Sequence, residues 1–274
     1  MALGVNTNVG AMVALQNLSK TNRDLEVTQG RINTGLAVAG AKDNGGIYAI
    51  AQAMRSDVAS LGAVGQSLGR AKSVVDVALA AGESISDLLV QMKEKAVAAA
   101  DASTDTTARA ALNEDFVALR KQISSIVSNA AFNGVNLINT ATGFQSLASA
   151  DGSSKISVNA ENLSLGGSII TIAATGQVNT QSAASTMLGT VNTSLTNANR
   201  ALARLGSISK RLDTQMEFNN KVSDALKAGI GNLVDADLSV ESARLQSLQV
   251  KQQLGIQALS IANGAPQTVL SLFR

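Results

Sequence analysis

Apolar residues recur every three or four positions along most of this chain, and almost nothing interrupts them. The chain has one proline, Pro266, so the usual helix breaker is absent from residues 1–265. Between residues 47 and 100 the spacing predicts one helix of roughly fifty residues, about 75 Å long at 1.5 Å per residue. A helix of that length does not form the core of a small globule. We therefore predict a mainly α fold: an elongated antiparallel bundle or coiled coil of long helices.

The two ends of the chain are unusually apolar. Residues 1–36 and 233–273 each have the pattern of an amphipathic helix, and Leu18, Leu25 and Ile32 are spaced by sevens, as in a seam between helices. Chain ends are normally polar and frayed. The two helices could simply close a monomeric bundle, but the middle of the chain already supplies enough apolar faces for one. Surplus apolar stripes indicate partners. The predicted packing residues are Val5, Val9, Met12, Leu18, Leu25, Ile32, Leu36, Leu245, Leu248, Ile256, Leu259, Val269, Leu270 and Leu272.

The stretch 137–184 differs from the rest because it is rich in Ser, Thr, Gly and Asn. It contains two short alternating runs, Lys155–Val158 and Ser168–Ile172, separated by Gly166 and Gly167. Alternation between apolar and polar residues is typical of strands, so these runs predict a small β-hairpin. Exposed Ser and Thr residues here are also possible acceptors of O-linked sugars.

A third helix precedes this stretch. It is expected to begin after a cap at Thr104 or Asp105 and to end at the turn sequence Phe132–Val135. The helical pattern returns near Ala184, so both termini should pair at one end of the molecule. The predicted domains are an inner terminal helical domain of 1–44 with 234–274, a long-helix bundle of 45–136 with 185–233, and a short β-rich variable segment of 137–184.

Composition excludes several classes of function. The chain contains no His and no Cys, which removes the commonest general base and the main soft metal ligands. We predict no catalytic, metal or cofactor site and therefore no enzyme. The net charge of +2 comes from scattered basic residues, which argues against nucleic-acid binding. No apolar run reaches the length of a membrane span, and the first residues do not have the pattern of a secretory signal.

Five fragments, taken in order, resemble bacterial flagellin. Asn6-Thr7-Asn8 is similar to the opening of that family, and Arg31–Leu36 followed by Ala41–Asn44 is similar to its Arg-Leu-Ser-Ser-Gly-Leu and Ala-Lys-Asp-Asp signature. Phe132–Leu137 resembles its Phe-Asn-Gly-x-x-Leu motif. The tail Asn263–Arg274 resembles its Ala-Asn-x-x-Pro-Gln-x-Val-Leu-x-Leu-Leu ending. Each fragment is weak alone, but together they are specific and cover both helical ends.

The resemblance implies a structural subunit that assembles as a homopolymer into the extracellular filament of the bacterial flagellum, for motility. It implies a short member without large outer domains, exported unfolded by the flagellar type III apparatus. Implied partners are the cap protein, the hook-associated proteins and an export chaperone that binds the C-terminal region. The terminal helices are expected to fold only as copies assemble.

One departure from the family concerns an immune epitope. Flagellins sensed by the innate immune receptor carry an arginine and, four residues later, a leucine, where this chain has Gln91 and Lys95. The resemblance therefore predicts weak receptor activation.

Three other functions compete with a filament subunit. A hook–filament junction protein shares the helical ends but assembles in few copies. A bundle enzyme would need an inward Glu-x-x-His pattern, which is absent. A filament-borne adhesin or hydrolase would need more chemistry than residues 137–184 offer.

Overall fold

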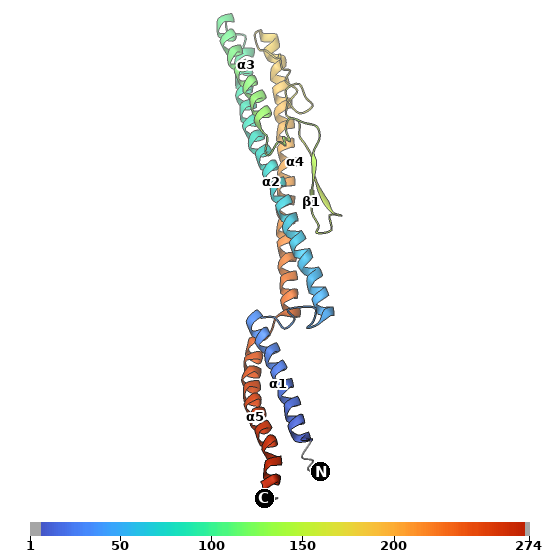
Figure 1. Ribbon diagram of the computed structural model, residues 1–274. Coiled ribbons are helices and arrows are strands. Elements are labelled where there is room, and N and C mark those ends of the chain that lie inside the picture. Colours follow the sequence, from blue (N-terminus) through green and yellow to red (C-terminus); the bar gives the residue numbers. More distant parts are fainter. Residues whose placement is uncertain (1–6, 272–274) are drawn as a thin grey trace. The chain divides into compact units, whose positions relative to one another are not determined.

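A computed structural model describes residues 7–271, with side chains described as far as residue 264. Within that range the elements are α1 (Val9–Thr34), α2 (Gly45–Ala100), α3 (Thr106–Asn129), β1 (Phe144–Leu147), β2 (Lys155–Val158), α4 (Gln181–Val234) and α5 (Leu238–Ser271). Figure 1 shows these long helices and the single small sheet. The predicted mainly α bundle with a small hairpin is thus confirmed.

The chain divides into two compact units. The terminal unit combines residues 1–56 with 225–274, and the central unit is 57–224. The predicted boundaries at residues 44 and 234 both fall inside the terminal unit. Helices α2 and α4 each contribute residues to both units.

In the terminal unit, capping residues fix where the helices begin and end. Asn8 accepts a hydrogen bond from the Ala11 N–H at the start of α1, and Asp237 accepts from Ser239 N–H at the start of α5. Helix α1 ends at Thr34 and is capped by Gly35, whose φ of 70° is left-handed and favours glycine. The loop that follows places Val38 in a small buried core.

The central unit has a continuous core between α2, α3, α4 and the loops beside them. Phe116 on α3 and Leu68, Ile85 and Met92 on α2 are completely buried. In the last turn of α2, the free backbone carbonyl of Ala99 accepts a hydrogen bond from Arg109 Nε of α3 at 2.8 Å. Asp105 caps α3, which settles the choice between Thr104 and Asp105.

The small sheet differs from the predicted hairpin in one strand. The predicted strand Lys155–Val158 is present, but it pairs antiparallel with Phe144–Leu147, and the prediction of a strand at Ser168–Ile172 is wrong. Three isoleucines in that run are buried rather than alternating, and the Thr171 N–H donates to Ser194 Oγ of α4 instead of to a strand. The run is therefore a core-filling loop held by helix side chains.

The turn predicted at Phe132–Val135 is confirmed. Phe132 and Val135 exchange backbone hydrogen bonds of 2.9 and 3.0 Å across a two-residue loop. Asn133 and Gly134 in that loop have φ values of 48° and 80°. Positive φ at both central positions is the geometry that an Asn-Gly pair favours.

Candidate assembly surface

Helices α1 and α5 of the terminal unit lie side by side and antiparallel (Figure 1). Three polar contacts connect them at intervals along their length. Asn8 Nδ2 donates to the Ala262 carbonyl at 2.6 Å, Gln252 Nε2 donates to Asn22 Oδ1 at 2.9 Å, and Arg31 Nη1 donates to Glu241 Oε1 at 2.8 Å. Residue numbers rise in one helix as they fall in the other, so the three contacts define one antiparallel register.

The apolar seam between these helices is shallow. Leu18 packs against Gly255, where an added Cβ would lie 3.2 Å from Leu18 Cδ1, so glycine allows close approach at this point. Leu248 is buried, and the other seam residues remain half-buried. Those half-buried predicted residues are Leu18, Leu25, Ile32, Leu36, Leu245 and Leu259.

Three predicted packing residues are largely exposed. Val9 is 62% exposed, Met12 63% and Ile256 54%. Four more predicted residues, Val5, Val269, Leu270 and Leu272, lie outside the described residues or side chains.

Further exposed apolar residues lie on the same two helices. Each is at least half exposed, and none is among the packing residues predicted from the sequence. They are Val13, Leu15 and Val27 on α1, and Leu238, Val240, Val250, Leu254 and Ile261 on α5. We refer to these eight residues, with Val9, Met12 and Ile256, as the exposed apolar surface. The sequence contained one signal for these residues: α1 and α5 have more apolar side chains than a single apolar stripe needs.

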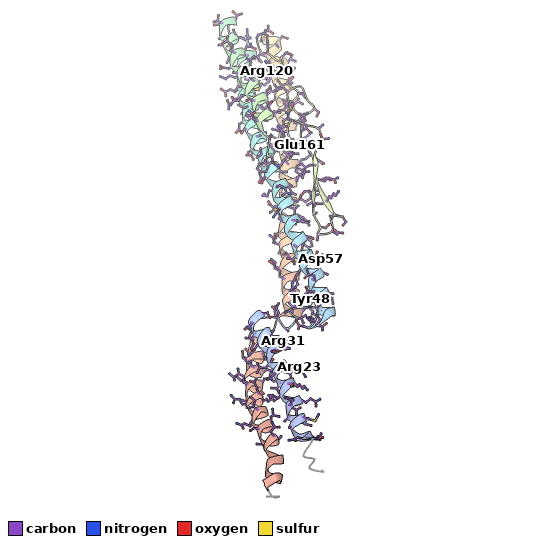
Figure 2. The ribbon with its side chains drawn as sticks, viewed as in Figure 1. Arg23, Arg31, Tyr48, Asp57, Arg120 and Glu161 are labelled. Atoms are coloured by element: carbon purple, nitrogen blue, oxygen red, sulfur yellow. The ribbon has the colours of Figure 1, made fainter. Side chains whose placement is uncertain are left out.

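The Arg31–Glu241 pair was not predicted. Glu241 in the first turn of α5 has a side chain only 9% exposed, whereas that of Arg31 is 31% exposed. Figure 2 labels Arg31 on the terminal unit. Glu241 Oε1 binds Arg31, but Oε2 is buried with no hydrogen-bond partner among the described residues. Because one oxygen already lacks a partner, losing the arginine would leave the whole buried carboxylate without a hydrogen bond, which is costly in free energy.

The two residues at the predicted altered immune epitope, Gln91 and Lys95, lie on α2 of the central unit. Gln91 is exposed, and Lys95 forms an ion pair with Asp115 of α3 at 2.8 Å. The hydrogen bond to the Asp115 carboxylate raises the pKa of Lys95. Weak receptor activation stays a prediction.

Two searches of the described residues concern other kinds of site. Across the described part of the chain, no three His, Cys, Asp or Glu side chains gather in a way that would hold a metal ion. None of the helices in residues 7–271 contains a stretch long and apolar enough to cross a bilayer.

Comparison with known proteins gives matches at both ends. The bacterial flagellin N-terminal helical region matches residues 5–143, and the bacterial flagellin C-terminal helical region matches residues 188–273. The chain is 53% identical to flagellin FljK of Caulobacter vibrioides, over 100% of both chains. It is 38% identical to a flagellin of Brucella melitensis, over 98% of both. A crystal structure of Bacillus cereus flagellin is 25% identical with a TM-score of 0.49, covering 55% of this chain and 86% of that one.

Proposed function

Because this chain belongs to the bacterial flagellin family, whose members are structural subunits of the extracellular flagellar filament, we propose that copies join through the exposed apolar surface of α1 and α5. The single observation that carries this proposal is that both helices keep large apolar side chains at least half exposed to water. An excess of exposed apolar side chains on two neighbouring helices is typical of an interaction site.

The energetics favour folding that is coupled to assembly. Ordering a residue costs about 1–2 kcal/mol of backbone entropy. Burying apolar surface contributes about 25 cal/mol per Å². In α1 the only buried residue is Thr28, and the described side chains of α5 add only Glu241 and Leu248. The pair thus gains little from its own burial, and burial against neighbouring copies supplies the remainder.

The small buried core of α1 and α5 also suits export before assembly. Helices with so little core of their own can pass unfolded through the flagellar type III apparatus, with a chaperone covering the C-terminal region in the cell. Cap and hook-associated proteins are the partners that would meet these helices at the filament tip. These partners follow from the family and from the exposed apolar surface, and each can be tested by binding to α5.

Charge substitutions on the exposed apolar surface test the proposal. Leu254→Glu changes a side chain that is 56% exposed, so the monomer should keep its helicity by circular dichroism. Electron microscopy and sedimentation should show that filaments are lost, because a carboxylate cannot be buried unpaired between copies. Gln253→Glu, at the neighbouring exposed residue, is the matched control and should still polymerise.

Truncation gives a second test. Removing residues 1–20 or 260–274 should abolish filaments and leave the central unit helical. Normal filaments from either truncation, or from Leu254→Glu, would contradict the proposal.

A further inference from the structure

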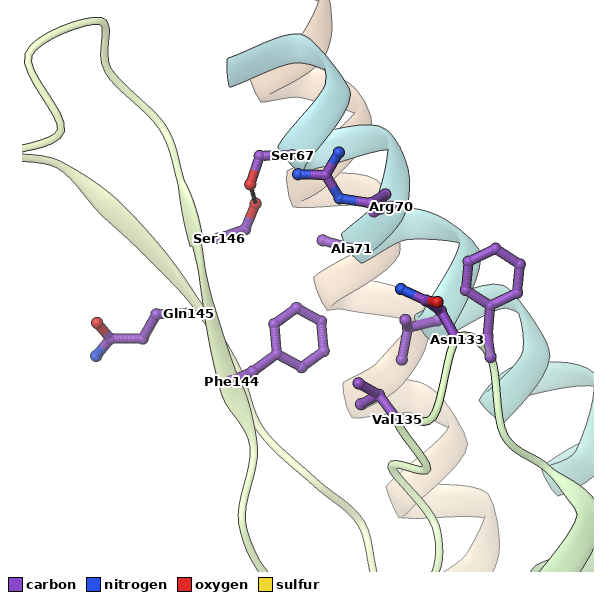
Figure 3. Close-up of a pocket in the computed structure, with 10 residues that line it drawn as sticks. Ser67, Arg70, Ala71, Asn133, Val135, Phe144, Gln145 and Ser146 are labelled. Carbon is purple, nitrogen blue, oxygen red and sulfur yellow. Dashed lines mark hydrogen bonds between the residues drawn. The ribbon is translucent and has the colours of Figure 1, made fainter. Parts of the chain in front are cut away.

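The central unit has a cleft beside the turn at Phe132–Val135. It is walled by Arg70 and Val74 of α2, by that turn, and by Phe144 of β1. Figure 3 shows the Phe144 ring pointing from the strand toward the helix, with Val135 beside it. We call this the aromatic cleft. Its volume of about 180 Å³ is smaller than the roughly 300–1,000 Å³ of ligand pockets, which favours a side chain of another protein over a small molecule.

The aromatic cleft combines apolar walls with an unpaired cation. Phe132 is 37% exposed and Val135 39%, so both retain apolar surface in water. Arg70 is exposed at the rim and forms no ion pair with any described residue. A fitting occupant therefore presents an aliphatic side chain next to a carboxylate.

The outer face of α2 has the complementary chemistry. Asp87, Val90, Glu94 and Val97 are spaced by three, four and three residues, so they share one face of the helix. Val90 is 52% exposed and Val97 50%, and both acids are exposed. Within the described chain neither Asp87 nor Glu94 forms an ion pair. We call these four residues the acidic ridge.

The two surfaces cannot meet within one molecule. Both lie on α2, and their centres, near residues 71 and 91, are separated by about 30 Å of helix at 1.5 Å per residue. A continuous helix cannot fold back on itself. Only another copy can bring an acidic ridge to an aromatic cleft.

We propose that the acidic ridge of one copy docks in the aromatic cleft of a second copy, with Glu94 or Asp87 on Arg70 and Val90 against Phe132, Val135 and Phe144. This inference rests on the proposed function, since it adds a second contact to copies that already polymerise. The contact is heterologous, because two different surfaces of the same chain meet. Such contacts produce open helical filaments when the rotation between copies does not close into a ring.

Charge reversal tests the docking. Arg70→Glu alone and Glu94→Arg alone place like charges together, so seeded filament elongation followed by light scattering should slow at least tenfold. The double variant restores an opposite pair and should regain most of the rate. Lys210→Glu and Glu114→Arg, at exposed positions outside both surfaces, are the matched controls and should elongate normally.

Circular dichroism, neutral variants and the Leu254→Glu result together separate a lost contact from a misfolded monomer. Circular dichroism of each monomer should match the parent, because every altered side chain is exposed. The neutral variants Arg70→Gln and Glu94→Gln should slow elongation less than the reversals do. Singles that elongate like the parent, or a double variant that stays as slow as the singles, would overturn the docking. If Leu254→Glu still blocks filaments in that case, the proposed function stands and only this contact fails.

Discussion

The central unit and the terminal helix pair use similar residues in opposite ways. In the central unit, Leu, Ile, Val and Ala from three helices and a loop converge on one core, with many side chains completely buried. In the terminal pair, α1 and α5 bring residues of the same types to a two-helix contact that covers few of them. Two helices have only one seam, so an apolar stripe wider than that seam remains in water. The comparison indicates that the central unit is stable alone and that the terminal pair requires neighbours.

The largest expected effect concerns the core of the central unit. Phe116→Ala removes a completely buried ring and should lower the free energy of unfolding of the monomer by about 3–5 kcal/mol. Phe218→Ala is the matched control because that ring is 58% exposed, and its effect should stay within about 0.5 kcal/mol. Chemical denaturation followed by circular dichroism measures both. Equal effects would mean that burial in the central core does not set the stability of this unit.

The next effect sharpens the comparison inside the terminal pair. Arg31→Ala leaves the Glu241 carboxylate buried without its donor, so the pair should lose about 1–3 kcal/mol. Glu241→Ala leaves Arg31 able to turn into water, so its cost should be smaller. Thermal melting of filaments assembled from each variant measures the difference. If Glu241→Ala proves the more damaging change, the burial of Glu241 does not govern this contact.

The smallest effect is local to the hairpin of the central unit. Asp151 accepts hydrogen bonds from Ser149 Oγ and Ser153 N–H, which lower its pKa to about 2. A lowered pKa stabilises the fold above the ordinary value near 3.8, and that contribution is lost as the pH falls through about 2. An NMR titration of the lone monomer should show this shift, and Ser149→Ala should move the pKa upward. An ordinary Asp151 pKa in the monomer would mean that this turn is not ordered without partners.

The helices of this fold were predictable because helical spacing over tens of residues is hard to imitate. The seam of Leu18, Leu25 and Ile32 was visible for the same reason. Strand β1 was missed because Phe144–Leu147 is short and lacks β-branched residues. The run Ser168–Ile172 was misjudged because a short apolar run in a core loop has the same composition as a strand.

The candidate site was predictable only in part. Periodicity identifies the apolar side of a helix, but it does not say how much of that side one neighbouring helix covers. Val9, Met12 and Ile256 were predicted as packing residues from periodicity alone, which contains no information on their exposure in the folded chain. The Arg31–Glu241 contact joins residues 210 positions apart, and a single sequence contains no signal for such a pair.

Hydrogen exchange of the lone monomer and of the filament tests the central claim most directly. Amides of the central unit, residues 57–224, should be protected in both states. Amides of α1 and α5 should exchange rapidly in the monomer and become protected in the filament. Terminal helices that are as protected in the dilute monomer as the central unit would contradict the claim that their order depends on neighbouring copies.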